Sequence, residues 1–403
     1  MQDFGYFCHK LKKMISFEEA YAIVTKNLPL NGNERVDYRD SAGRVLAEDI
    51  FSDIHMPPFD KAAVDGYACR MTDIHQPLQL LEVIPAGSTP AKEIIAGSCS
   101  KIMTGAMMPS GADCVVMVEQ TREENGVVFI TDTRTKANIA YLAEDIKAGD
   151  KVISKGTVIK PQHIAILATA GAISPLVFKK ARITVMSTGD ELVEPHVAPG
   201  PGKIRNSNSS QLVAQAIAMG ADAEYGGIIA DTEQSSRQMI TDALTKSDVV
   251  ILSGGISMGD FDFIPAILNE MGIEILFRSV AVQPGKPSVF ARSGNKFVFA
   301  LPGNPVSSFN IFELLAKPFL YKLMGHTYSP VRLRIPIGEN YSRKALARHG
   351  FVPAIIDAHG RAMPVHYHGS AHINALVQAT ALISVPLGVA SFNEGDLVDV
   401  RLI

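Results

Sequence analysis

The chain has 403 residues, of which 47% are apolar and 20% charged, a composition that is typical of globular proteins and excludes a disordered chain. At roughly 150 residues per domain, this length predicts two to four domains. Lys and Arg number 38 and Asp and Glu number 41, so the net charge is −3, which argues against a general nucleic-acid-binding surface.

Neither secretion nor membrane insertion is indicated. Residues 1–13 lack the apolar stretch of a signal peptide and are expected to be a short tail or an upstream start. No apolar run approaches the ~18 residues of a membrane span. The four cysteines are Cys8, Cys69, Cys99 and Cys114. They include no CxxC pair, which favours reduced, mostly buried thiols, so we expect a cytoplasmic enzyme or binding protein.

Local signals predict several elements in the first half of the chain. Ser16 and Glu19 have the spacing of a capping box at the start of a helix. The apolar runs 115–118 and 127–130 flank a turn and predict a β-hairpin. A helix is predicted over 161–172, with proline at its start and glycine near its end.

From residue 182 onward, strands and helices alternate. Strands are predicted at 183–186, 226–230, 249–252 and 297–301. Helices are predicted from Asn208, as N-cap, to near Gly220, and over 231–246, 265–271 and 310–315. This alternation predicts parallel βαβ units in a three-layer α/β domain. Predicted strands at 331–335, 381–385 and 397–402 indicate a small all-β C-terminal domain.

Polar, glycine-rich loops follow nearly every strand of the predicted α/β domain. The loop residues are Ser187, Thr188, Gly189, Asp190, Glu191, Asp231, Ser253, Gly254, Gly255, Ser257, Asp260, Asp262, Pro302, Gly303 and Asn304. Because ligands bind outside the carboxyl ends of parallel strands, these loops are expected to gather around one ligand site.

The loop chemistry suggests a phosphorylated ligand together with a divalent cation. Backbone N–H groups and serine hydroxyls suit phosphate. Glu191, Asp231 and Asp262 would repel phosphate unless Mg²⁺ or another divalent cation lay between them. Each carboxylate alone also fits a turn or a helix cap, so not all need contact the metal.

Two further clusters are notable. Residues 57–68 contain Asp60 and Asp65 after a Pro-Pro segment, and residues 103–113 form a small-residue loop. Five histidines lie in the C-terminal domain: His349, His359, His366, His368 and His372. No nearby cysteine supports a zinc site, so a polar or anion-facing surface is preferred to a metal site.

Five segments together resemble one family. Residues 57–68 resemble PPFDxSAMDGYA, 101–119 resemble RIMTGAxxPxGADAVVxxE, 185–192 resemble STGDEL, 248–262 resemble DxVxxSGGxSxGxxD, and 299–307 resemble GLPGNPVS. These are signatures of the molybdopterin molybdenumtransferases, the MoeA and gephyrin E-domain family. They occur in the same order from about residue 14 to the C-terminus.

The resemblance implies a multidomain α/β plus β fold. It comprises a tail (1–13), an elongated N-terminal linker domain (14–55 and 146–180), an inserted mixed α/β domain (56–145), a MogA-like three-layer α/β molybdopterin-binding domain (181–328) and a C-terminal β-barrel-like domain (329–403). It also implies a homodimer whose site lies between the α/β domain of one chain and the inserted domain of the other. The implied reaction cleaves adenylylated molybdopterin, releases AMP and inserts molybdenum from molybdate with help from Mg²⁺. An adenylyltransferase and molybdoenzyme-maturation proteins are the implied partners.

The candidate site residues combine this resemblance with the loop analysis. The expected catalytic residues are Asp60, Thr104, Asp145, Glu191 and Asp262, and the expected metal ligands are Glu191, Asp231 and Asp262. The expected substrate-binding residues are Asp65, Ser187, Thr188, Gly189, Ser253, Gly254, Gly255, Ser257, Lys286, Pro302, Gly303, Asn304, Arg348 and Ser370.

Three positions depart from the family pattern. Ala140 replaces an arginine, Ala143 a glycine, and Gln283 a lysine. Lys136 and Lys147 are the nearby cations in sequence that could compensate at the first position. Two rival functions stay open: a divergent paralogue that inserts molybdenum poorly or uses tungstate, and a scaffold or binding protein.

Overall fold

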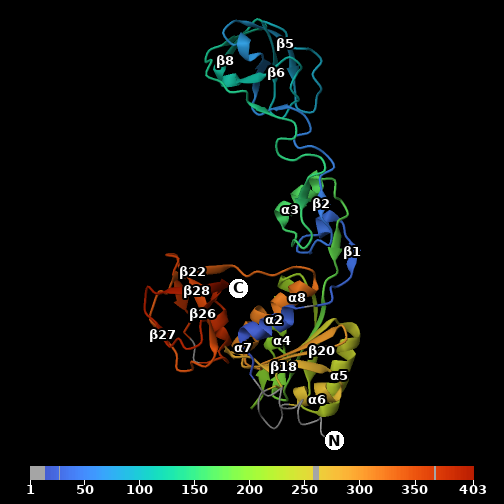
Figure 1. Cartoon of the computed structure of the whole chain (residues 1–403), viewed down its shortest axis with the longest axis vertical. Helices are drawn as coiled ribbons and strands as arrows, with labels where there is room; N and C mark the ends of the chain where they lie inside the picture. Colours follow the sequence, from blue (N-terminus) through green and yellow to red (C-terminus); the bar gives the residue numbers. More distant parts are fainter. Residues whose placement is uncertain (1–13, 27, 257–262, 367–368) are drawn as a thin grey trace. The chain divides into compact units, whose positions relative to one another are not determined.

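The computed structural model describes residues 14–26, 28–256, 263–366 and 369–403. It divides into two compact units. The N-terminal unit holds Arg35–Ala42 and Glu48–Pro175, and the main unit holds the chain up to Glu34, Gly43–Ala47 and Leu176–Ile403. Figure 1 labels several elements of both units. None of the helices in the described ranges is long and apolar enough to cross a membrane.

A six-stranded sheet forms the body of the N-terminal unit, in the order β7-β4-β6-β5-β9-β8. The strands are β4 (Gly66–Cys69), β5 (Leu78–Ile84), β6 (Ser98–Ile102), β7 (Cys114–Met117), β8 (Thr121–Glu124) and β9 (Val127–Ile130). The other elements are η1 (Tyr38–Asp40), β2 (Ile50–Phe51), β3 (Lys61–Ala62), η2 (Met71–Asp73), η3 (Val118–Gln120), β10 (Ile139–Ala140), β11 (Lys151–Ile153) and α3 (Pro161–Thr169). Buried side chains pack on both faces of this sheet.

The predicted hairpin exists, but one of its strands was assigned wrongly. Residues 127–130 pair with β8 (Thr121–Glu124), whereas residues 114–117 form β7 and pair with β4. The turn of the hairpin is Asn125-Gly126, and both residues have positive φ angles, 49° and 77°. A two-residue turn of this kind connects directly adjacent strands, so the partner strand has to end at Glu124.

In the main unit, a mixed sheet has the order β16-β13-β17-β21-β20-β18. Its strands are β13 (Arg182–Thr188), β16 (Asp222–Ile229), β17 (Val249–Ser253), β18 (Glu274–Ser279), β20 (Pro287–Ser293) and β21 (Lys296–Leu301). The first four strands in this order are parallel to one another, as predicted. The sequence analysis missed β18 and β20, which extend the sheet antiparallel to their neighbours.

Helices cover both faces of this sheet, which confirms the three-layer arrangement. The helices are α2 (Phe17–Thr25), α4 (Asn208–Ala218), α5 (Glu233–Lys246), α6 (Ile264–Glu270), α7 (Pro305–Ile311), the π-helical turn η4 (Phe312–Ala316) and α8 (Lys317–Leu323). Residues of α5 and α6 pack in one core with alternate residues of β17 and β21. Helices α4, α7 and α8 are on the other side in Figure 1. The predicted capping box of Ser16 and Glu19 is present at α2.

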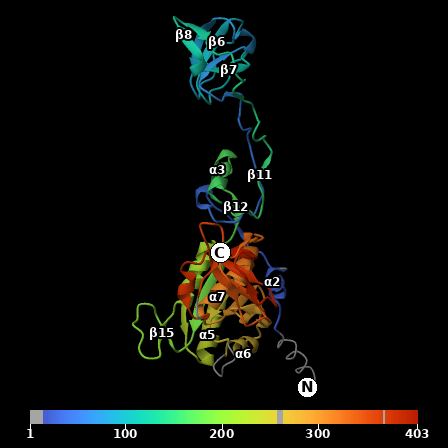
Figure 2. The same ribbon diagram turned by 90° about the vertical axis from the view of Figure 1, so that its left-hand side faces the viewer.

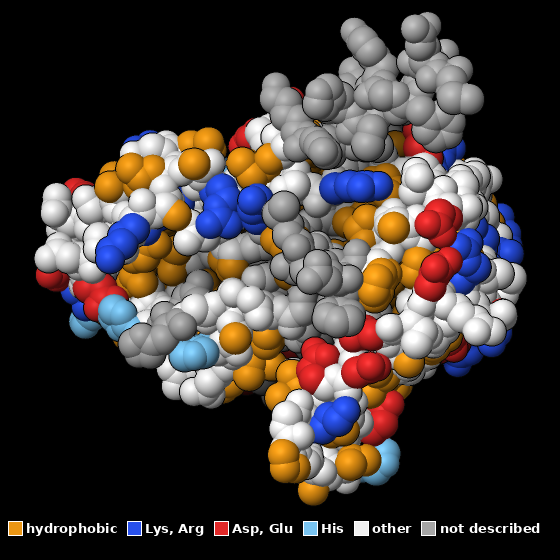
Figure 3. Space-filling view, turned by 90° about the horizontal axis from the view of Figure 1, so that it is seen from below, with side chains coloured by type: hydrophobic (Ala, Val, Ile, Leu, Met, Phe, Trp, Pro, Cys, Tyr) orange, Lys and Arg blue, Asp and Glu red, His pale blue; other side chains and the backbone are white. Residues whose placement is uncertain are grey.

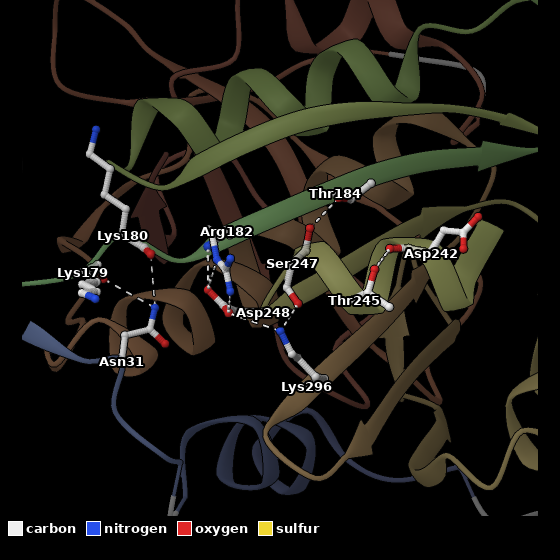
Figure 4. A network of polar contacts seen from close by, with 10 residues as sticks. All are labelled: Asn31, Lys179, Lys180, Arg182, Thr184, Asp242, Thr245, Ser247, Asp248 and Lys296. Carbon is white, nitrogen blue, oxygen red and sulfur yellow. Dashed lines mark hydrogen bonds and ion pairs between the residues drawn. The ribbon is translucent and has the colours of Figure 1, made fainter. Parts of the chain in front are cut away.

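Polar contacts tie together the amino ends of three parallel strands (Figure 4). Asp248 accepts hydrogen bonds from the backbone N–H and the guanidinium of Arg182, and Lys296 lies 3.6 Å away. Burial raises the pKa of Asp248, but the hydrogen bonds from Arg182 outweigh it and hold the pKa below its ordinary value. This cluster lies at the amino ends of the strands, opposite the carboxyl ends that carry the glycine-rich loops.

The C-terminal part of the main unit is a β domain, as predicted. Its strands are β22 (Arg332–Pro336), β23 (Tyr341–Ser342), β24 (His349–Ile356), β25 (Ala362–Pro364), β26 (Ala381–Val385), β27 (Ser391–Phe392) and β28 (Leu397–Leu402), with the short helix η5 (Ile373–Leu376). The sheet order is β19-β24-β26-β28-β22. Strand β19 (Val282–Gln283) belongs to the α/β part of the sequence and pairs in parallel with β24. This pairing brings residues near 286 beside residues near 348.

Two of the remaining strands lie where the chain passes from one unit to the other, and two lie at the base of a projecting arm of the main unit. Strand β1 (Asn33–Arg35) and strand β12 (Leu176–Phe178) lie where the chain passes between the units. Strands β14 (Leu192–Val193) and β15 (Ile204–Arg205) form a parallel pair at the base of an arm that projects from the main unit in Figure 2. The domain boundaries given above stay a prediction.

Candidate active site

The loops after β13, β16, β17 and β21 meet at the carboxyl edge of the parallel strands and enclose a cavity of about 700 Å³. This sheet-edge cavity is lined by Ser187, Thr188, Gly189, Glu191, Leu192, Ile204, Arg205, Asn206, Ser207, Asn208, Asp231, Ser253, Gly254, Gly255, Ile256, Pro287, Pro302, Gly303, Asn304, Pro305, Ala371 and Ile373. The structure therefore brings together the loop residues expected to surround a ligand, except Asp190, which is not part of the lining, and Ser257, Asp260 and Asp262, which lie outside the described residues.

The two glycines after β17 are required by the backbone and by a close neighbour. Gly254 and Gly255 have φ angles of 98° and 66°. A Cβ atom on either would lie 2.8 Å from Oγ1 of Thr188. That hydroxyl is buried and has no hydrogen-bond partner within the described residues. The glycines thus let two loops approach closely and leave an unsatisfied polar atom beside the cavity.

Carboxylates lie on one side of the sheet-edge cavity. Asp190 and Asp231 each accept a hydrogen bond from the backbone N–H of the other, at 3.1 and 3.2 Å. Glu191 is exposed and its carboxylate packs over Gly189, where any Cβ would collide with it. Figure 3 shows a group of acidic side chains below the centre of the face that it views, whereas lysines and arginines are spread over this face.

These carboxylates fit only a particular kind of cation site. Within the described ranges, no group of three His, Cys, Asp or Glu side chains could hold a metal ion by itself. Mg²⁺, however, is commonly held by one or two carboxylates together with ligand phosphates and waters. Glu191 and Asp231 line the same cavity and supply that partial set.

Asn208 was predicted to cap a helix and instead connects the site loops. It is the first residue of α4, not the N-cap, which is Ser207. Its Nδ2 donates to Ser253 Oγ and to the carbonyl of Gly303, both at 2.7 Å. Its Oδ1 is buried without a partner in the described chain. The only signal in the sequence was an asparagine at the start of a predicted helix, and it was interpreted as local capping.

A second cavity of about 380 Å³ adjoins the first, and we call it the cation-lined cavity. Its lining is Gln283, Pro284, Gly285, Lys286, Pro287, Pro302, Asn304, Ser307, Tyr341, Arg343, Arg348, Gly350, Val352, Gly369 and Ser370. The two cavities share Pro287, Pro302 and Asn304. Nδ2 of Asn304 donates to Oγ of Ser370 at 2.9 Å. This hydrogen bond holds Asn304 in place where the two cavities adjoin.

Three cations line this second cavity. Lys286 and Arg348 were expected from the sequence, whereas Arg343 was missed. The Arg343 guanidinium donates to the backbone carbonyls of Arg348, Pro386 and Val389 at 2.6–2.9 Å. None of the three cations forms an ion pair with the described residues. Their charge is therefore available to an anion of matching size.

The predicted residues of the N-terminal unit form a separate cluster. Oδ1 of Asp65 accepts from the backbone N–H and the hydroxyl of Thr104, at 2.6 and 2.8 Å. These hydrogen bonds hold the pKa of Asp65 below its ordinary value. Oδ1 of Asp60 accepts from the backbone N–H of Leu142 at 2.6 Å, and Asp145 lies exposed in the same loop. The motif segments near residues 60, 104 and 142 thus meet.

A lysine lies opposite Ala140, the position at which the family pattern has an arginine. Ala140 in β10 lies directly opposite Lys61 in β3 in an antiparallel ladder. Directly opposite side chains lie on the same face of a sheet. Lys61 is half-buried and therefore places a cation where the family pattern has its arginine. Sequence proximity pointed to Lys136 and Lys147 instead, because strand pairing is invisible in a single sequence.

Ala143, which replaces a glycine of the family pattern, has a φ angle of 61°. This left-handed conformation costs a non-glycine residue about 1–2 kcal/mol, and Ala143→Gly would remove that cost. Glycine also has the greater conformational entropy in the unfolded state, which offsets part of the gain, so the variant is expected to be more stable by up to about 1 kcal/mol. Ala148→Gly serves as the matched control and should not stabilise, because Ala148 has no positive φ. Denaturant unfolding of both variants measures this, and equal effects would refute the strain at Ala143.

The histidines of the C-terminal domain do not form a metal centre within the described residues. His349 stacks on Phe351 and its Nε2 lies 2.7 Å from Oγ of Ser384. Burial lowers the pKa of His349. His366 lies 2.8 Å from a carboxylate oxygen of Glu339, and His368 is outside the described residues.

Comparison with known proteins gives matches along most of the chain. Family models described as "MoeA N-terminal region (domain I and II)", "Probable molybdopterin binding domain" and "MoeA C-terminal region (domain IV)" match residues 15–171, 184–322 and 339–403. A molybdopterin molybdenumtransferase of Bacillus subtilis is 36% identical over 92% of this chain and 90% of its own length. One of Staphylococcus epidermidis is 35% identical over 96% and 95%. The chain belongs to the MoeA family.

Solved MoeA structures agree with this assignment. A molybdopterin biosynthesis MoeA protein from Pyrococcus horikoshii is 28% identical, with a TM-score of 0.83 over 97% of this chain and all of the other. A further structure of that name is 30% identical with a TM-score of 0.79. The fold of this MoeA-family chain is therefore shared along its length, whereas the roles of its individual site residues stay predictions.

Proposed function

We propose that this chain is a molybdenum insertase, which takes adenylylated molybdopterin and molybdate, releases AMP and places molybdenum on the dithiolene sulfurs. Its curated relatives are named molybdopterin molybdenumtransferases and align over 90% or more of this chain. The observation that carries the proposal is the pair of adjoining cavities, one with carboxylates and hydroxyls and one with three cations. A phosphorylated organic substrate and a small oxyanion can be held side by side there.

In the sheet-edge cavity, hydroxyls and backbone groups bind the nucleotide part of the substrate. Ser253 and Gly303 are held in place by Asn208, so the loops after β17 and β21 are fixed relative to one another. Glu191 and Asp231 would hold Mg²⁺ together with substrate phosphate. When bound, such a cation neutralises charge on the phosphates during cleavage of the pyrophosphate linkage.

In the cation-lined cavity, Lys286 and Arg348 bind the oxyanion through charge-assisted hydrogen bonds. Ser370 is oriented by Asn304 and offers its hydroxyl to the same ligand. Asp60 and Thr104 of the N-terminal unit act at the dithiolene or molybdate end of the substrate from the partner chain of a homodimer. An adenylyltransferase supplies the substrate, molybdoenzyme-maturation proteins take the product, and the reaction is cytoplasmic.

The proposed function is tested by incubating the protein with adenylylated molybdopterin, Mg²⁺ and molybdate while following AMP release and cofactor formation together. Insertase activity requires both products to appear and both to be lost with EDTA. Cofactor formation with tungstate but not molybdate would favour the divergent paralogue. Binding of the nucleotide without AMP release would favour a binding protein.

The composite site makes a separate prediction about mixed dimers. Asp60→Ala and Glu191→Gln chains, each with low activity alone, should regain activity when their subunits exchange. Random mixing of equal amounts leaves about one quarter of the sites with both residues intact, so about a quarter of wild-type activity is expected. The measurement is AMP release after exchange, with exchange itself verified by mass-tagged subunits. No recovery after proven exchange would contradict a site shared between chains.

A further inference from the structure

Three of the four cysteines lie in one row across the sheet of the N-terminal unit. Cys69 in β4 is directly opposite Cys114 in β7 on one side and Cys99 in β6 on the other. All three side chains are fully buried. Cysteines so scattered in the sequence, at positions 69, 99 and 114, come together only through strand pairing. The row lies outside both cavities described above.

Within this row, Cys69 and Cys114 form the close pair. Their sulfur atoms lie 3.6 Å apart, and the Cys114 thiol also lies 3.5 Å from the carbonyl oxygen of Cys69. Directly opposite residues of antiparallel strands have Cα atoms about 4.5–5.5 Å apart. A disulfide spans Cα separations of about 4.4–6.8 Å, so the backbone already fits the bond. Only the sulfurs have to approach, to about 2.05 Å.

We propose that Cys69 and Cys114 are a modification site, at which a peroxide oxidant forms a reversible cross-strand disulfide. The three thiols do not together make a metal site within the described chain. Cys114 is the first residue of β7, which is the edge strand of the sheet. Local opening of a strand end at the edge needs less free energy than opening of the core, so peroxide reaches this thiol first.

The chemistry balances with hydrogen peroxide as the oxidant. The Cys114 thiolate attacks one peroxide oxygen, the O–O bond breaks, and the leaving hydroxide takes a proton to become water. The Cys69 sulfur then attacks the resulting sulfenic acid, its S–H proton leaves with the hydroxyl as a second water, and the S–S bond forms. The two thiols lose two electrons and two protons, and one peroxide is reduced to two waters.

The ionisation of the three thiols favours this order of events. The hydrogen bond with Cys69 lowers the pKa of Cys114 and raises that of Cys69. Burial raises the pKa of Cys99 to about 12, with a further contribution from Glu123. Since the thiolate is the reactive form, Cys114 reacts first and Cys69 resolves the sulfenic acid, while Cys99 stays a thiol.

The test uses the full chain with Cys8→Ser, so that the cysteine outside the described residues cannot react. After treatment with hydrogen peroxide, tryptic digestion separates the three remaining cysteines, which fall in peptides 62–70, 93–101 and 102–122. The expected product is one cross-link between peptides 62–70 and 102–122, with a mass loss of about 2 Da that dithiothreitol reverses. The cross-link closes a long loop, so the Tm should rise by about 5 °C or more.

Two variants serve as controls. Cys99→Ser should form the same cross-link at an unchanged rate, whereas Cys114→Ala should form none. The peptide map of the Cys8→Ser chain decides the question even if a core variant folds poorly. A cross-link between peptides 62–70 and 93–101, sulfinic acid at Cys114 without a cross-link, or three unreacted thiols would each overturn the proposal.

Discussion

Glu191→Gln is expected to reduce kcat for AMP release by about 100-fold or more, with little change in the free energy of unfolding. The side chain keeps its size and still fits over Gly189, so only the negative charge is lost. Within the described residues, Glu191 and Asp231 are the cavity-lining carboxylates that can face a cation between protein and phosphate. The variant should therefore also need more Mg²⁺ for half-maximal rate.

Two matched variants test whether the activity depends on the charge of Glu191 and on its place in the cavity. Glu191→Asp keeps the charge and should retain more activity than Glu191→Gln. Glu270→Gln removes an exposed carboxylate at the end of α6, outside both cavities, and should leave kcat unchanged. Steady-state AMP release across a Mg²⁺ titration measures all three. If Glu191→Gln were folded and matched the wild-type Mg²⁺ dependence, Glu191 would not act through its charge.

Lys61→Ala is expected to weaken binding of molybdate or of the nucleotide about tenfold or more, because a charge-assisted hydrogen bond contributes roughly 1.5–3 kcal/mol. Ala140→Arg should restore the affinity in the Lys61→Ala chain, since the two positions are directly opposite. In the wild-type chain, Ala140→Arg should give a smaller gain, because like charges in opposite positions repel each other.

Calorimetric titration with each ligand, applied to both single variants and the double variant, measures the coupling between the two positions. Lys136→Ala is the control, because Lys136 is near Ala140 in sequence but is not its partner in the ladder. Additive effects of the two substitutions would show that Lys61 and Ala140 do not share one role. If Lys136→Ala weakened ligand binding as much as Lys61→Ala does, the effect would come from the positive charge of the region in general and not from the position of Lys61.

Local sequence signals predicted the four parallel strands of the α/β domain, the helices that follow them and the edge where the loops meet, but not the other strands of this domain. The capping box at Ser16 and Glu19 is a contact three residues apart, and the parallel strands β17 and β21 have continuous apolar runs. Where elements were missed or misassigned, a long-range pairing decided the structure. Strand β24 contains Gly350 and Pro353, which argue against a strand locally, yet it pairs with β26 and β19.

The order of strands and helices along the chain is enough to predict which loops lie at one ligand site, because parallel strands joined by helices must place their carboxyl ends on the same edge. Which side chains meet across separate segments became known from the three-dimensional fold. Strand β19 pairs with β24 and brings Lys286 near Arg348, and β3 pairs with β10 and places Lys61 opposite Ala140. Such pairings join residues more than 60 positions apart, so their register depends on packing of the whole domain and leaves no local periodicity in the chain.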